Sequence, residues 1–119
     1  MIDGKWAKQF AMEWIESWNS HDLDRIFSHY TDDFEMMSPL IIARMKVTSG
    51  TLQGKEKVRP YWQAGLSAQP PLKFEFIDVF TGAKSIALHY RNASGKFVIE
   101  ILMFNDQGKV VRGIAHYSE

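Results

Sequence analysis

The last third of the chain places two long apolar runs around a short polar turn, which predicts a β-hairpin. Residues 97–104 are apolar at every position but one, as in a strand that is buried on both faces, and residues 110–117 form its partner. Gly108 closes the intervening turn, where glycine can adopt the positive φ that such loops need. We take this hairpin as the element around which the rest of the fold is organised.

Glu100 is the one charged residue within the first of these runs. Its neighbours in the sequence are all apolar: Val98, Ile99, Ile101 and Leu102. A carboxylate is costly to bury unless it is paired, protonated or used in a reaction. Glu100 is therefore the strongest chemical signal in the sequence.

The N-terminal part has the spacing of two amphipathic helices. In the first, large apolar side chains recur at every fourth position: Trp6, Phe10, Trp14 and Trp18. The second is expected over residues 23–30, where apolar side chains are three and four positions apart, and Asp32-Asp33 should end it. Asn19-Ser20 breaks the first helix and can cap the second, so we expect the two helices to lie in antiparallel contact.

The middle of the chain is predicted to alternate between strand and helix. Residues 34–39 form a strand that ends at a proline, and residues 41–48 are expected to form a further short strand. Two glycines bracket a loop at residues 50–54. Residues 55–66 have the apolar spacing of a third helix, which its internal proline should kink.

Two more strands precede the hairpin. Residues 72–80 alternate apolar and polar side chains and then slip by one position, as a bulged strand does. In residues 85–92, one face carries the large side chains, and the other carries Ser85, Ala87 and His89, which are small and polar enough to line a cavity. The order of the elements predicts an α+β fold with helices on one face of the sheet.

The composition narrows the class of protein. A chain of 119 residues is long enough for one domain, residues 1–119, with its own core. The absence of cysteine excludes disulfides and thiolate chemistry and favours a cytoplasmic location. A net charge of zero argues against a nucleic-acid-binding face. No apolar run resembles a signal peptide or reaches the about 20 residues of a membrane span, so no membrane partner is expected.

The order of these elements, together with residues 21–40, 54–62 and 104–117, resembles the SnoaL-like branch of the nuclear transport factor 2-like superfamily, whose fold is related to ketosteroid isomerase. The resemblance covers essentially the whole chain. It implies a cystatin-like cone, in which a curved, mostly antiparallel sheet wraps around three N-terminal helices and an apolar pocket. It also implies a homodimer formed through the outer face of the sheet. Because this scaffold hosts cyclases, isomerases, dehydratases, epoxide hydrolases and non-catalytic modules, the resemblance specifies the fold and not the activity.

A comparison with ketosteroid isomerase, position by position, leaves one functional position in common. Glu100 falls where that enzyme keeps its protonated oxyanion-hole carboxylic acid. Ser38 falls where its catalytic carboxylate belongs, and Trp14 falls where its oxyanion-hole tyrosine belongs. Since a serine hydroxyl with no adjacent base cannot shuttle a proton, the resemblance argues against a steroid isomerase of that mechanism.

His89 is the candidate partner of Glu100. If the turn between residues 85–92 and 97–104 has an even number of loop residues, His89 lies directly opposite Glu100, and directly opposed side chains can touch. The carboxylate would favour the imidazolium, whereas burial would oppose both charges, so each group would shift the pKa of the other. The pair is then either an acid/base dyad or a structural contact between two strands.

The register of the last strand decides what else faces Glu100. With a three-residue turn, Glu100 shares its face with Arg112, and a buried ion pair would weaken the case for catalysis. With a four-residue turn, it shares its face with Ala115 and Tyr117, whose hydroxyl would then point into the cavity. We favour the second register, because relatives have it.

These observations together predict a pocket with the following lining residues: Trp14, Trp18, Tyr30, Ser38, Trp62, His89, Glu100, Leu102 and Tyr117. The leading hypothesis is a SnoaL-like protein that binds a small, largely apolar molecule with a carbonyl or hydroxyl group. If it is an enzyme, Glu100 and His89 move protons in an isomerisation, cyclisation or dehydration that needs no cofactor. The alternative is a non-catalytic ligand-binding or dimerisation module. Four scattered histidines without metal-binding spacing predict no metal site.

Overall fold

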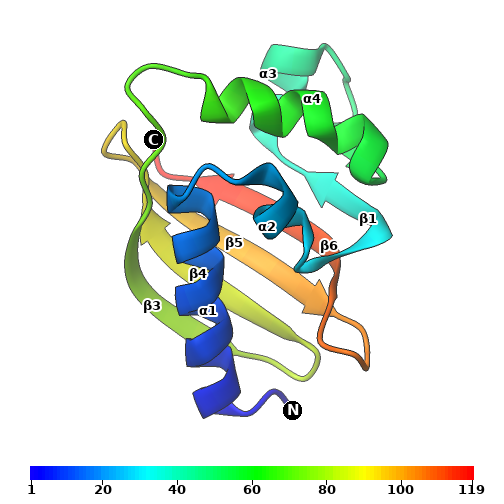
Figure 1. The fold of residues 1–119 in the computed structure, drawn as a ribbon, viewed down its shortest axis with the longest axis vertical. Helices are drawn as coiled ribbons and strands as arrows, with labels where there is room; N and C mark the ends of the chain where they lie inside the picture. Colours follow the sequence, from blue (N-terminus) through cyan, green and yellow to red (C-terminus); the bar gives the residue numbers. More distant parts are fainter.

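The computed structural model describes residues 1–119 and consists of four helices and one six-stranded sheet (Figure 1). The helices are α1 Gly4–Asn19, α2 Leu23–Phe27, α3 Pro39–Met45 and α4 Lys55–Leu66. The strands are β1 Tyr30–Met37, β2 Thr51–Gln53, β3 Glu75–Thr81, β4 Ser85–Arg91, β5 Phe97–Phe104 and β6 Val110–Tyr117. None of the helices has both the length and the apolar character needed to cross a membrane.

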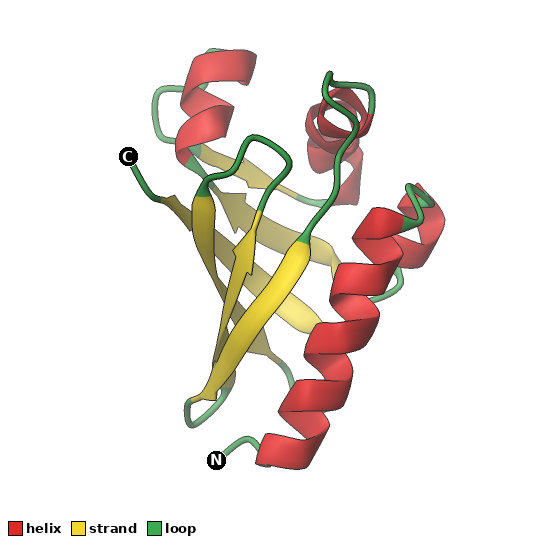
Figure 2. Cartoon of the chain, turned by 90° about the vertical axis from the view of Figure 1, so that its left-hand side faces the viewer, coloured by secondary structure: helices red, strands yellow, loops and turns green.

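The sheet is open, curved and mostly antiparallel. Its strand order is β2-β1-β6-β5-β4-β3, and the pair formed by β1 and β6 is the one parallel pair. Figure 2 shows the sheet curving past α1, with α3 and α4 at one end of it. This confirms the predicted α+β cone.

Helix α1 packs across the concave face of the sheet against β3. Asp3 caps its N-terminus: the side chain of Asp3 accepts a hydrogen bond from the backbone nitrogen of Trp6 at 3.0 Å. The apolar residues buried on its inner side are Ala7, Ala11, Trp14, Ile15 and Trp18. The repeat of large side chains predicted this helix correctly.

The second helix is shorter than predicted. It ends at Phe27, because the chain then turns into β1, where Tyr30 pairs with Val110 and the backbone nitrogen of Val110 bonds to the carbonyl of His29 at 2.8 Å. Asp32-Asp33 therefore lies within a strand and does not end a helix. The side chain of Tyr30 fits the apolar spacing of the helix, but the core contact that buries it is made from the strand.

The short strand predicted over residues 41–48 is wrong, because this segment forms α3. Ser38 caps the helix by accepting a hydrogen bond from the backbone nitrogen of Leu40 at 3.2 Å, and Pro39 occupies the first turn, where its missing donor costs nothing. Ile41 is the one buried residue of this helix. A cap followed by proline therefore outweighs the strand propensity of the apolar residues.

The C-terminal hairpin has the predicted bounds. Glu100 pairs with Ala115, so Gly113 and Tyr117 share its face, which is the favoured register. The cause is a bulge between Met103 and Phe104 and not a four-residue turn, because Phe104 pairs with Val110 next to the turn. The prediction that β5 is buried on both faces is wrong for the single chain. The face that carries Glu100 is buried, whereas Phe97 and Met103 on the other face are 50% and 36% exposed. The helices cover only the concave side of the sheet, which leaves the outer side open.

The register between β4 and β5 differs from the prediction. Arg91 pairs with Phe97, so the connection contains five residues, 92–96, and Leu88 stands opposite Glu100. His89 stands opposite Ile99 and lies on the outer face of the sheet. Because side chains alternate along a strand, an odd loop in place of an even one moves every side chain of β4 to the other face.

The packing of α1 makes a testable prediction about stability. Ile15→Ala should lower the free energy of unfolding by about 2–5 kcal/mol, because Ile15 is 6% exposed and its removal leaves a cavity. Met12→Ala on the same helix is the matched control and should cost about 0.5 kcal/mol or less, since Met12 is 44% exposed. Urea unfolding of the two variants measures the difference. Equal losses of stability in the two variants would contradict the packing of the Ile15 side of α1 against the core.

Candidate functional site

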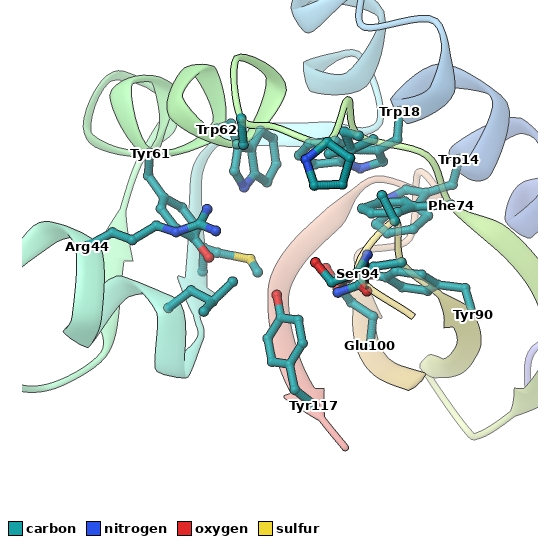
Figure 3. A pocket seen from close by; sticks show the side chains of 18 residues that line it. Trp14, Trp18, Arg44, Tyr61, Trp62, Phe74, Tyr90, Ser94, Glu100 and Tyr117 are labelled. Atoms are coloured by element: carbon teal, nitrogen blue, oxygen red, sulfur yellow. Dashed lines mark hydrogen bonds between the residues drawn. The ribbon is translucent and has the colours of Figure 1, made fainter. Parts of the chain in front are cut away.

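A cavity of about 140 Å³ lies between the helices and the concave face of the sheet (Figure 3). Seven of its 18 lining residues are aromatic: Trp14 and Trp18 from α1, Tyr61 and Trp62 from α4, Phe74 from the segment before β3, Tyr90 from β4 and Tyr117 from β6. Besides the tyrosines, the ionisable residues of the lining are Glu100 of β5 and Arg44 of α3. Such a mostly apolar cleft with few polar groups is typical of small-molecule sites.

Glu100 is the buried carboxyl group of this cavity. It is 4% exposed, and its Oε1 atom accepts a hydrogen bond from the hydroxyl of Tyr90 at 2.8 Å. Burial raises the pKa of Glu100 from 4.5 to about 7, and the hydrogen bond from Tyr90 opposes part of that rise. No ion pair of the chain includes Glu100. The carboxyl group can therefore both lose and gain a proton near neutral pH.

Tyr90 is held in place by aromatic contacts. Its ring centre lies 4.3 Å from that of Phe74 and 5.4 Å from that of Trp14. Burial, followed by the charge of Glu100, raises the pKa of Tyr90 well above its ordinary value, so the hydroxyl keeps its proton. Tyr90 is therefore a hydrogen-bond donor to Glu100 and not a competing acid.

The indole nitrogen of Trp14 does not face the cavity as a free donor. It donates a hydrogen bond to the hydroxyl of Tyr30 at 2.9 Å. Tyr30 is 2% exposed and does not line the cavity, contrary to the prediction. Although Trp14 occupies the position of an oxyanion-hole residue in the sequence comparison, its N–H group is already engaged within the core.

A second group of hydroxyls lies around α3. The hydroxyl of Tyr61 donates to the Oγ atom of Ser38 at 3.2 Å, and Tyr117 points its hydroxyl into the cavity (Figure 3). Burial is the largest cause of a raised pKa at both tyrosines. Ser38 and Leu102 are buried in the core and do not line the cavity, so the prediction that they do is wrong.

His89 does not contact Glu100, so the predicted dyad is wrong. The imidazole lies on the outer face of the sheet, where its ring centre is 5.9 Å from that of Phe97. The face of β4 that turns inward is the one with the larger side chains, Ile86, Leu88 and Tyr90, of which Tyr90 lines the cavity. The concave side of the sheet packs against apolar helices, so the larger, apolar face of β4 turns inward.

Five of the predicted lining residues do meet around the cavity: Trp14, Trp18, Trp62, Glu100 and Tyr117. Lining residues that the sequence pattern did not predict include Tyr90, Tyr61, Arg44 and Phe74. Tyr90 could have been identified from the sequence, because it is the one residue with a hydroxyl group among the large side chains on its face of β4. Arg44 had none, since its segment was interpreted as a strand. No group of three or more His, Asp or Glu side chains is placed to hold a metal ion.

The comparisons with known proteins agree on one family. The family model described as SnoaL-like domain matches residues 11–118. A SnoaL-like protein of unknown function from Burkholderia thailandensis is 46% identical, with a TM-score of 0.95 over 99% of this chain and 98% of that one. No curated protein matches the chain.

Two more distant structures have the same fold. SalBIII, described as an epoxide hydrolase/cyclase-like enzyme in pyran ring formation in the polyether salinomycin, is 17% identical, with a TM-score of 0.75 over 99% of this chain and 95% of that one. An NTF2-like protein of unknown function from Burkholderia pseudomallei is 14% identical, with a TM-score of 0.75 over 94% of this chain and 90% of that one. At these identities the likeness shows the fold alone.

The raised pKa of Glu100 predicts how stability depends on pH. The folded protein binds this proton more tightly than the unfolded chain, so the resulting stabilisation is fully present below pH 4.5 and is lost as the pH rises through about 7. Across this window the wild type should lose stability relative to Glu100→Gln, by up to about 1.4 kcal/mol for each pH unit. Urea unfolding of both proteins at several pH values measures the difference. Parallel curves for the two proteins would contradict the raised pKa.

Proposed function

Because the chain belongs to the SnoaL-like family, we propose that it binds a small, largely apolar molecule in the cavity and that Glu100 transfers a proton on that molecule. The observation that carries this proposal is the state of Glu100: a carboxyl group removed from water, with one tyrosine partner, facing an aromatic cavity. A pKa of about 7 suits a group that must accept a proton and then return it at neutral pH.

The ionised form of Glu100 is the base in this mechanism. It takes a proton from a carbon next to a carbonyl group, or from a hydroxyl group, and the neutral acid then delivers that proton to another atom of the same molecule. The proton is conserved over the cycle, so an isomerisation or a ring closure needs no cofactor. A dehydration follows when the returned proton goes to a leaving hydroxyl group, which departs as water.

The tyrosines around the cavity support this chemistry in two ways. Tyr90 stabilises the carboxylate by its hydrogen bond and fixes its orientation, so it is a positioning residue. The hydroxyl of Tyr117 points into the cavity, where it can hold a polar group of the ligand away from Glu100 (Figure 3). His89 has no part in this mechanism.

The comparison with SalBIII is consistent with this class of reaction. That protein is described as an epoxide hydrolase/cyclase-like enzyme in pyran ring formation, which is a ring closure that requires proton movement. The proposal for this chain rests on its own buried carboxyl group and not on that description. The lack of cysteine fits the cytoplasm as the proposed location.

The proposal extends to a homodimer formed through the outer face of the sheet. The paired strands place apolar side chains side by side on that face: Phe80, Ala87, Phe97, Ile99, Ile101, Met103 and Ile114. Phe80 and Phe97 are 57% and 50% exposed in the single chain. A second copy would remove this apolar area from water.

Loss of the Glu100 carboxylate should abolish proton abstraction. We expect wild type to exchange the α-protons of phenylacetone or cyclohexanone for deuterium in heavy water, at a rate that rises with pH and levels off above about 7. Glu100→Gln should lower this rate by about 100-fold or more, because the amide cannot act as a base. Proton NMR of the ketone measures the exchange.

Glu75→Gln is the matched control for this experiment, since it makes the same change at an exposed position of β3 and should keep the wild-type rate. If the ketones bind and no exchange is catalysed, the proton-transfer proposal fails and a binding module remains.

A charge in the middle of the outer face should break the dimer. We expect wild type to elute as a dimer, and Ile101→Lys as a monomer, because Ile101 lies between Ala87 and Ile114 on that face. Met12→Lys, on the exposed side of α1, is the control and should leave the dimer intact. Size-exclusion chromatography with light scattering gives the mass. A monomeric wild type, or an unchanged dimer in Ile101→Lys, would contradict the interface.

A further inference from the structure

The cavity has a second polar feature, which the proton-transfer proposal does not use. Around α3 and the end of β6, it is lined by three groups that can donate hydrogen bonds: the guanidinium of Arg44, the hydroxyl of Tyr117 and the indole nitrogen of Trp62 (Figure 3). The indole nitrogen of Trp62 is turned toward the cavity, and Arg44 is an exposed residue at its edge. Together these donors can bind an acceptor that a ligand supplies.

We infer that this part of the cavity binds a carboxylate of the ligand, so that the substrate is a small apolar carboxylic acid held between Arg44, Tyr117 and Trp62. The inference rests on the proposed function and specifies the chemical class of its substrate. The carboxylate would accept hydrogen bonds from these three donors, and its hydrocarbon part would lie along Trp14, Trp18 and Phe74 toward Glu100.

Arg44 is free to make this contact. None of the ion pairs of the chain includes Arg44. The one carboxyl group of the cavity lining is that of Glu100, so no carboxylate near α3 balances the charge of the guanidinium. Its side chain passes Gly65 of α4, where an added Cβ atom would stand 3.9 Å from the Nη1 atom. The guanidinium therefore lies beside Gly65, which also lines the cavity. A planar guanidinium can donate two parallel hydrogen bonds to a carboxylate, which a lysine cannot.

The two charged groups of the cavity both act on Tyr61 and Tyr117. Burial raises the pKa of these tyrosines, the charge of Glu100 adds to the rise, and the charge of Arg44 opposes it, so the guanidinium lies near these hydroxyls. No cation contributes to the pKa of Glu100, which depends on burial and on Tyr90. Arg44 therefore does not neutralise Glu100, and a ligand can place its carboxylate at the first group and its reacting atoms at the second.

Matched pairs of compounds test the assignment in the folded full-length chain. Phenylacetate and cyclohexylacetate are titrated alongside their primary amides, which have the same carbon skeleton and no charge. The indole N–H signals of the four tryptophans are followed by nitrogen-15 NMR. We expect each acid to bind about tenfold more tightly than its amide, since hydrogen bonds to charged groups are the stronger ones. The signal of Trp62 should shift, whereas that of Trp6, which does not line the cavity, should not.

Variants of the donor residues separate the contribution of the Arg44 charge to binding from that of the other cavity contacts. Arg44→Gln should weaken phenylacetate binding by about tenfold and leave the amide unchanged, and Tyr117→Phe should weaken it by a smaller factor. Arg59→Gln is the matched control: it removes the same charge from α4, where Arg59 lies over the ring of Phe27 at 4.9 Å, outside the cavity lining. It should bind both compounds as wild type does.

The results distinguish failure of the inference from failure of the proposed function. If the amides bind as tightly as the acids, or if Arg44→Gln weakens both compounds equally or neither, the carboxylate assignment is overturned and the proposed pocket stands. If neither member of either pair shifts a tryptophan signal, the proposed ligand cavity is overturned together with the inference.

Discussion

Burial of the Glu100 carboxyl is the constraint on which the rest of this structure depends. A carboxylate out of water is unfavourable, and the fold offers it one hydrogen bond, from Tyr90, and no cation. The protonated and ionised forms therefore lie close in free energy at neutral pH. The aromatic side chains of α1 and α4 line the cavity beside this group, so its surroundings are mostly apolar.

Much of this arrangement was predictable from the sequence, because it depends on local pattern. The hairpin, the first helix and the helix over residues 55–66 have long periodic runs, and their bounds agree with the structure. Glu100 could be found because a single carboxyl group within an apolar strand is conspicuous. The register of β6 could be inferred from the resemblance, and it places Tyr117 in the cavity.

The partner of Glu100 could not be found in the same way. Which face of β4 looks inward depends on whether its connection to β5 has an odd or even number of residues, and that number is set by turn geometry and not by the apolar pattern. The odd connection sends His89 outward and Tyr90 inward. Arg44 was missed for a related reason: a short apolar segment fits a helix or a strand, and only the cap at Ser38 decides it. The site thus combines residues from elements with strong patterns and from elements with weak ones.

Direct titration of Glu100 tests the central claim most closely. Carbon-13 NMR of the glutamate side-chain carboxyls, with Glu100→Gln used to assign the signal, reports its pKa in the free protein. We expect a midpoint of about 7, and a further rise in Tyr90→Phe because the hydrogen bond that stabilises the carboxylate is lost. A midpoint near the ordinary value of 4.5 would mean that water reaches the carboxyl group, and it would contradict the burial of Glu100 on which the proposed site depends.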